Sequence, residues 1–507
     1  MFNGQPKGLY ALALANTGER FGYYTMLAVF TLFLKDNFAF SEATATVIYS
    51  TFLMLVYFLP LFGGMLADKI GFGKCVTIGI TIMFLGYLLL SVPLGKGTTA
   101  IAAMGAALLL VCIGTALFKG NLQVMVGNLY DDPKYAAQRD NGFSIFYMAI
   151  NVGALFAATA AIGIMAYMQQ HYGYSKADSY HFAFAVACFS LVVSMLIYFG
   201  FRKTFQHADV ASAKQTPDAL KSAEPELSKA ETKERIVALL LVFAVVIFFW
   251  MAFHQNGSTL TYFAEQYTNK THLTGVQAML FDVVNLCLGI VIIYALFAIF
   301  QSKKTSSKAI AALVAAIAAG ILVWKYTTIP AEGISIETPI FQQFNPCFVV
   351  ALTPVSMAIF GALGKRGKEP KAPLKIGLGM LVAAVGYVLM TIASAGLPTP
   401  EAQKAAGFAT LVSPNWLILT YLILTFAELL LSPIGISFVS KVAPPKYKGM
   451  MMGGWFVATA IGNFLVVIPG LLWGNKPLML VWGVLVAICL VSAGFIFSIL
   501  KKLNKVA

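Results

Sequence analysis

The sequence predicts an all-α membrane protein that crosses the bilayer many times. Of its 507 residues, 59% are hydrophobic and only 11% are charged, and the mean hydropathy is +0.79. A soluble domain is typically about 45–50% apolar and about 25% charged. Many separate apolar runs also reach about 20 residues, the length that an α-helix needs to cross a hydrocarbon core about 30 Å thick. These observations predict a polytopic helical membrane protein.

Fourteen apolar runs have this length, and we expect each to form one transmembrane helix. The predicted spans are 9–34, 44–67, 75–93, 99–129, 142–168, 179–201, 235–256, 275–300, 308–327, 340–363, 373–396, 414–440, 450–473 and 477–500. An even number of spans places both termini on one side. Most Lys and Arg residues fall in the loops of that side, so the positive-inside rule predicts that it is cytoplasmic. This bias accounts for the net charge of +14 without nucleic-acid binding.

The segment 202–234 differs from the rest of the chain. It is polar, rich in Ala, Ser, Lys and Glu, and has no apolar stripe, which predicts a cytoplasmic linker between residues 1–201 and 235–507. The six cysteines all fall in hydrophobic runs without paired spacing. This pattern predicts neither a disulfide framework nor a metal site.

The first span contains an unusual polar stretch. Helical spacing places Asn16, Arg20, Tyr23, Tyr24 and Leu27 on one stripe, while the side chain of Glu19 is expected to point about 100° away from that of Arg20. A charge at bilayer depth costs at least about 2.5–3.5 kcal/mol, so such residues usually face a bundle interior or a watery cavity. We interpret the stripe as an anion-binding and proton-handling site. The alternative is a local ion pair that holds helices together.

Two further charges lie inside predicted spans. Lys119 is near the middle of 99–129, and Glu428 is the single acid of 414–440. Packing between helices is an alternative role for Lys119. In a dry interior, opposite charges about 4 Å apart attract strongly, whereas water weakens the attraction toward about 1 kcal/mol. Because Lys119 and Glu428 belong to opposite halves, we hypothesise that their attraction stabilises one closed state, which substrate or a proton opens.

The turn after the second span reads GMLADKIGFGK at 64–74 and matches the pattern G-x-x-x-D-[RK]-x-G of major facilitator transporters. Asp68 and Lys69 are expected to form a cytoplasmic latch there. Other segments resemble, in order, those of the proton-dependent oligopeptide transporter family, a branch of the major facilitators. These segments are NTGERFGYY at 16–24, YFLPLFGG at 57–64, FSIFYMAINVGAL at 143–155, FW with QNGSTL at 249–260, FQ with NP at 341–346, Glu428 with Ser432-Pro433 and Gly435, and Trp455.

The resemblance covers about residues 9–470 and implies a fold and a function. The implied fold has two six-helix bundles, with an extra helix pair at about 275–327 in the C-terminal one. The implied function is proton-coupled import of di- and tripeptides by alternating access across an inner (plasma) membrane. Protons would be the coupling ion, with no other cofactor, no metal and no enzymatic activity. We expect small peptides and the lipid bilayer as partners, and a monomer.

A peptide is a zwitterion, so its site needs a receiver for each charge. Arg20 suits the carboxylate, with Lys119 beside it, and Glu428 suits the ammonium group. The other predicted substrate-binding residues supply hydrogen bonds or amphipathic walls and are Tyr23, Tyr24, Tyr57, Tyr147, Asn151, Asn345, Ser432 and Trp455. The resemblance implies that Glu19, Lys119 and Glu428 take part in proton coupling.

Three residues depart from the family pattern. Asn16 replaces the first acid of ExxER, Leu27 replaces an arginine of the outer gate, and His254 replaces a glutamate of the seventh family helix. His254 could titrate near neutral pH in compensation, although a hydrogen-bonding role is the alternative. The departures leave open weakened proton coupling, or another cargo such as nitrate, another small anion or an amino-acid conjugate.

A membrane enzyme or a channel is the alternative function outside the transporter class. The sequence has no HExxH, CxxC, GxSxG or paired-carboxylate element in a convincing context, so it gives no support for catalysis. A channel would need a ring of equivalent residues, which a core of two unlike halves does not readily provide.

Overall fold

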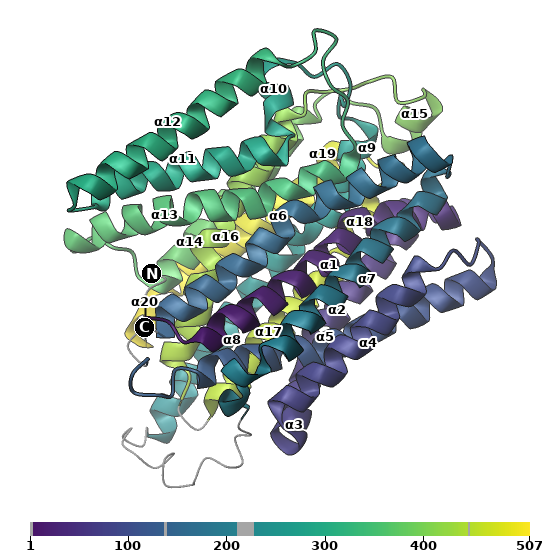
Figure 1. Cartoon of the computed structure of the whole chain (residues 1–507). Helices are drawn as coiled ribbons and strands as arrows, with labels where there is room; N and C mark the ends of the chain where they lie inside the picture. Colours follow the sequence, from purple (N-terminus) through teal and green to yellow (C-terminus); the bar gives the residue numbers. More distant parts are fainter. Residues whose placement is uncertain (1–3, 136–138, 210–227, 445–446, 507) are drawn as a thin grey trace. The chain divides into compact units, whose positions relative to one another are not determined.

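The computed structural model describes residues 4–135, 139–209, 228–444 and 447–506 (Figure 1). Within these residues, 13 helices are long and apolar enough to cross a membrane. They coincide with the 13 predicted spans from 44–67 onward, which confirms the prediction of a polytopic all-α membrane protein.

The first predicted span lies inside α1 (Lys7–Phe38), a single helix of 32 residues. At 1.5 Å per residue such a helix is about 48 Å long, more than enough to cross a bilayer. It is not among the 13 apolar helices, and it carries the polar stretch 16–24. It ends at Ala39, whose left-handed backbone (φ 53°) lets its N–H donate to the carbonyl of Leu34. The predicted span that fails the apolar criterion therefore lies in one of the longest helices of the described structure.

The chain folds into two compact units. Unit 1 comprises residues 1–257 and 439–471, and unit 2 comprises residues 258–438 and 472–505. The predicted bundle limits, 1–201 and 235–507, remain predictions. Of the predicted linker 202–234, residues 202–208 form two short 3₁₀ turns, a helix begins at Lys229, and residues 210–227 lie outside the described part of the chain.

In unit 1, helices α1, α6 and α7 pack on one another, α4 packs on α5 and α7, and α17 packs on α2 and α8. The second predicted span divides into two helices because Pro60 starts a new one. The elements of this unit are α1, α2 (Glu42–Phe58), α3 (Pro60–Ile70), α4 (Phe72–Ser91), α5 (Thr98–Asn128), α6 (Arg139–Tyr172), α7 (Lys176–Gly200), η2 (Arg202–Thr204), η3 (Gln206–Ala208), α8 (Lys229–Phe253), η5 (His254–Gly257), α17 (Lys448–Leu465) and α18 (Val467–Leu472).

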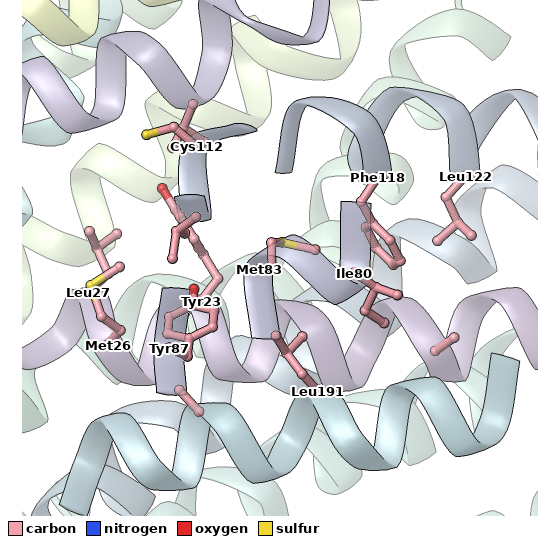
Figure 2. Close-up of a cluster of buried hydrophobic side chains, with 14 of the residues drawn as sticks. Tyr23, Met26, Leu27, Ile80, Met83, Tyr87, Cys112, Phe118, Leu122 and Leu191 are labelled. Carbon is pink, nitrogen blue, oxygen red and sulfur yellow. The ribbon is translucent and has the colours of Figure 1, made fainter. Parts of the chain in front are cut away.

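The core of unit 1 is a cluster of buried apolar side chains, most of them from α1, α2, α4, α5, α6 and α7. Figure 2 shows Tyr23, Met26, Leu27, Ile80, Met83, Tyr87, Cys112, Phe118, Leu122 and Leu191 within it. Small residues let α4 and α5 approach closely: a Cβ on Gly114 would lie 2.6 Å from the carbonyl oxygen of Gly79. Leu27 is 7% exposed in this cluster, so the position of the family's arginine is here part of the apolar core.

In unit 2, α11 packs on α12 and α13, and α14 packs on α19. The elements are α9 (Thr259–Gln266), α10 (Gly275–Leu280), α11 (Val283–Gln301), α12 (Thr305–Thr327), η6 (Thr338–Gln343), α13 (Phe344–Lys365), α14 (Ala372–Ala393), α15 (Pro400–Ala405), α16 (Asn415–Val442, to residue 438), α19 (Leu478–Ser498) and α20 (Leu500–Val506).

The extra helix pair α11–α12 starts later than predicted. The predicted span 275–300 is broken because Asp282 adopts an extended conformation and caps α11, its Oδ1 accepting from the N–H of Val284 at 2.7 Å. The other oxygen of Asp282 pairs with Lys325 at the end of α12. This acid therefore makes a local contact between the two helices.

A carboxylate from outside the helix caps α4. Gly71 precedes this helix without a side-chain cap, and the N–H of Gly73 donates instead to Asp209 at 2.6 Å. Because losing a cap typically costs about 0.5–2 kcal/mol, Asp209→Ala is expected to lower the free energy of unfolding in detergent by that amount. Asp209→Asn keeps the acceptor oxygen and is the matched control. Equal stability of Asp209→Ala and the native chain would contradict the capping role.

Candidate functional site

The centre of the polar stretch is a buried ion pair between neighbours on α1. Arg20 donates from Nε and Nη2 to the two carboxylate oxygens of Glu19, each at 2.5 Å. Arg20 is 3% exposed and Glu19 is fully buried. The expected divergence of these side chains was therefore wrong. Their Cβ atoms leave the helix in different directions, but both chains are long enough to converge. The pair satisfies the carboxylate and neutralises most of the guanidinium charge within one helix.

Aromatic rings adjoin Arg20. Its Cζ lies 4.6 Å from the centre of the Tyr23 ring, a cation–π contact. Tyr23 in turn meets Tyr24 edge to face at 5.2 Å and stacks on Phe52 at 6.2 Å. The structure thus brings together Arg20 and Tyr23, as the predicted stripe requires, and seats the pair against the apolar core of unit 1.

Lys119 lies in the same region of unit 1. Its Nζ is 4.0 Å from the centre of the Tyr57 ring, and the charges of Glu19 and Arg20 both act on it. Among the described residues, no carboxylate lies within ion-pairing distance of Lys119. We call Glu19, Arg20, Tyr23, Tyr57 and Lys119 the cationic cluster. With two cations and one acid, it carries a net charge of +1 when all three are ionised.

The imidazole of His254 lies next to the cationic cluster. It starts η5 directly after α8, stacks on Trp250 at 5.1 Å with the planes 20° apart, and lies 6.3 Å from the Tyr57 ring. Asn463 of α17 is beside it and is fully buried. Asn463 was not predicted as a site residue, although it is a lone amide inside the apolar run 450–473.

Several polar atoms of His254, Trp250 and Asn463 are buried without a hydrogen-bond partner among the described residues. Nδ1 of His254, Nε1 of Trp250 and both amide atoms of Asn463 are buried and complete no hydrogen bond with the described residues. The carbonyl of Trp250 and the amide of Asn463 lie close to the imidazole of His254. An unsatisfied buried polar group costs about 1–3 kcal/mol. These atoms are therefore suited to bind water or a polar group of a substrate.

Unit 2 contains a separate acidic cluster, which we define as Asn345, Thr425, Glu428 and Ser432. Asn345, near the start of α13, donates to Glu428 and to Thr425 on α16, at 3.0 Å each. Glu428 is 8% exposed and makes no ion pair with the described residues. One turn further along α16, the Ser432 hydroxyl is buried without a partner in the described structure. Thr425 was missed, although it lies three residues before Glu428 on the same helix face.

The other predicted residues lie elsewhere. Asn151 on α6 donates to the carbonyl of Tyr147, one turn earlier, at 3.1 Å, and Tyr147 is half exposed. Trp455 is 3% exposed and packs on Phe243, a contact between α17 and α8. Asn16 is 3% exposed. In the predicted latch, Lys69 is exposed and the side chain of Asp68 lies outside the described part of the chain.

The fold and the two charged clusters indicate a class of membrane protein. Long apolar helices that bury unlike-charged clusters are typical of a multi-pass membrane transporter. A family model described as the POT family matches residues 74–223 and 312–469. This chain therefore belongs to the POT family, as its motifs indicated.

Curated relatives cover most of the chain. An uncharacterised transporter of Bacillus subtilis (strain 168), YclF, is 28% identical over 520 residues, which cover 98% of this chain and 94% of the relative. A di-/tripeptide transporter of Lactococcus lactis subsp. lactis is 27% identical and covers 90% of this chain and 87% of its own length. Dipeptide and tripeptide permease A of Salmonella typhi is 27% identical, covering 91% and 83%.

Solved structures confirm the transporter fold. A crystal structure of peptide transporter POT in complex with sulfate has a TM-score of 0.75 and 22% identity, and it covers 100% of this chain and 96% of that one. A POT family transporter in complex with 5-aminolevulinic acid has a TM-score of 0.74 and 20% identity, covering 99% and 98%.

Proposed function

We propose that this chain is a proton-coupled symporter that imports di- and tripeptides by alternating access across the plasma membrane. The observation that carries the proposal is chemical. Unit 1 contains a cluster with a spare positive charge, and unit 2 buries an acid that only neutral groups bind. The names of the relatives from Lactococcus lactis and Salmonella typhi support peptides as the cargo.

Each cluster fits one end of a peptide. A carboxylate competes with Glu19 for the fork of Arg20, because both groups accept the same two parallel hydrogen bonds. Lys119 adds a second cation, which lies over the Tyr57 ring and makes no ion pair with the described residues. An ammonium group suits Glu428, which offers a negative charge and free lone pairs beside the amide of Asn345. The tyrosine rings of the cationic cluster can contact apolar side chains of different size on a bound peptide.

Proton coupling is proposed to use Glu19 and Glu428, whose neighbours change when substrate binds. Glu19 loses the hydrogen bonds of Arg20 once a carboxylate replaces it, and it then needs a proton or another donor. His254 is proposed to assist as a third titratable group. The family pattern has an acid at the position of Asn16. With Asn16 there, Glu19 is the only carboxylate of α1 that precedes Lys35 in the sequence.

The experiment is uptake of labelled dialanine by proteoliposomes under an inward proton gradient. The native chain is expected to accumulate dialanine above equilibrium, and Asn16→Glu is expected to increase the gradient dependence, because it adds a second titratable acid to the polar stretch 16–24. Equilibration without accumulation would contradict symport but leave peptide transport standing. Asn16→Gln, which adds no acid, is the matched control for the change in size.

A second candidate function is transport of another small anion or an amino-acid conjugate. The net positive cluster and the neutral residues at positions 16 and 27 favour it. Excess unlabelled dialanine should abolish the labelled uptake if peptides are the cargo, whereas excess nitrate should not. The reverse result would assign the anion.

We also propose that the protein is a monomer and that both termini face the cytoplasm. The orientation rests on the concentration of Lys and Arg in the loops of one side.

A further inference from the structure

One end of unit 2 carries exposed cations that the proposed function does not use. They lie between the end of α13 and the start of α14, and at the start of α20. We call this group the basic patch and define it as Lys365, Arg366, Lys368, Lys371, Lys501 and Lys502. All six residues are exposed, and none of them makes an ion pair with another described residue. The patch is therefore a concentration of uncompensated positive charge on the surface.

The fold brings the two segments of the patch together, although they are far apart in the sequence. Nζ of Lys371 donates to the carbonyl oxygen of Asn504 on α20 at 3.1 Å, a contact between residues 133 positions apart. The helices beside them also pack closely, so that a Cβ on Gly377 of α14 would lie 2.5 Å from Cε1 of Phe497 on α19. Leu503 is fully buried and anchors α20. The cations of both segments are therefore held close to one another.

The acid beside the patch does not neutralise it. Glu369 is the only acid of the segments 363–375 and 496–506. Its carboxylate accepts from Nζ of Lys375 at 2.5 Å, and Lys375 is a buried residue outside the patch. Because these two charges compensate each other, the positive charge of the six exposed cations remains available to a ligand.

The helices that lead to the patch expose apolar side chains. Met357 on α13 is 71% exposed, and Val491 on α19 is 72% exposed. Each lies about two turns before the end of its helix. Exposed apolar side chains on a spanning helix contact the acyl chains of the bilayer, and the cations beyond them reach the headgroups. A ligand of this surface therefore needs both an apolar chain and an anionic head.

We propose that the basic patch binds an anionic phospholipid, whose headgroup lies against the cations of both segments and whose acyl chains lie along the exposed side chains of α13 or α19. Ammonium and guanidinium groups form charge-assisted hydrogen bonds with phosphate oxygens. Clusters of four to eight Lys and Arg residues directly beside a transmembrane helix are typical of sites for anionic lipids. The apolar surface favours a lipid over a free phosphate, which has no chain to bury there.

The test is binding of a phosphatidylglycerol with a fluorophore on one acyl chain, measured by anisotropy with the chain purified in a neutral detergent. The native chain is expected to bind it at least about tenfold more tightly than a phosphatidylcholine with the same acyl chains. The triple variant Lys368→Gln/Lys501→Gln/Lys502→Gln should lose about tenfold in affinity for phosphatidylglycerol, because it removes half of the cations. It leaves the contact of Lys371 with Asn504 in place. Equal binding of the two lipids by the native chain would overturn the proposal.

The matched control is Lys303→Gln/Lys304→Gln/Lys308→Gln. These lysines are also exposed, and they lie in or next to the turn between α11 and α12. Because successive spans alternate in direction, this turn lies on the same side of the membrane as the basic patch. The control therefore removes the same charge from the same side, and its affinity should stay within about twofold of the native value. Equal losses in the two triple variants would mean that net charge alone attracts the lipid, and the proposal would be wrong.

Two measurements on the native chain complete the test and do not depend on the folding of any variant. Inorganic phosphate at the concentration of the lipid should not displace it, and full displacement would assign the patch to a free phosphate instead. Raising the salt concentration should weaken the binding of phosphatidylglycerol, because salt screens exposed charges. Binding that does not respond to salt would contradict the role of the cations. Since no cargo is present, these outcomes are independent of the proposed function.

Discussion

Replacing Arg20 by leucine is expected to abolish dialanine uptake and to lower the free energy of unfolding by about 3–5 kcal/mol, the usual cost of breaking a buried ion pair. The reason is the bidentate geometry. Arg20 supplies the only hydrogen bonds that Glu19 accepts in the described structure, and Glu19 is fully buried. Without the guanidinium, an uncompensated carboxylate remains in the core. The measurements are denaturation in detergent and uptake by proteoliposomes.

The double variant Glu19→Gln/Arg20→Leu separates the two losses. With the acid also removed, no buried charge is left behind, so most of the lost stability should return. Uptake should stay abolished, because the receiver for a carboxylate is missing. If Arg20→Leu were as stable as the native chain, the pair would not be an isolated buried pair, and the description of the cationic cluster would be wrong.

The fold could be predicted because the bilayer imposes the same physical constraint on each transmembrane segment. Each spanning segment must be long, apolar and helical, and this constraint is visible in the sequence without knowledge of its neighbours. The finer breaks follow local chemistry. Asp282 interrupts a predicted span because its carboxylate caps the next helix better than it would fit inside one. Polarity alone could not locate this break, because the residues on either side of it are apolar.

The site was only partly predictable, because periodicity describes where Cβ atoms point and not where long side chains end. It separated Glu19 from Arg20, which the structure joins. Residues that meet from different helices also leave no spacing signal. Asn463 and His254 are separated by a long stretch of chain, and neither forms a motif with the other. The predicted attraction between Lys119 and Glu428 remains a prediction.

Lys119→Ala is the second large effect that we expect, and its signature differs from that of Arg20→Leu. Concentrative uptake of dialanine should fall at least tenfold, while the free energy of unfolding should change by less than about 1 kcal/mol. No carboxylate among the described residues pairs with Lys119, so its removal leaves no charge uncompensated. It removes only a cation–π contact with Tyr57, worth about 0.5–2 kcal/mol, and the cost of burying the ammonium offsets it.

The control for Lys119→Ala is Tyr57→Phe, which keeps an aromatic face beneath the ammonium and should retain uptake if the ring matters only for that contact. Lys119→Ala with full concentrative uptake would contradict a role for this charge in transport. The contrast between the two cations follows from their partners. Arg20 already has an acid, so its loss harms the fold, whereas Lys119 is held over a ring without one. A cation kept in that way is available for an anion that arrives during the transport cycle.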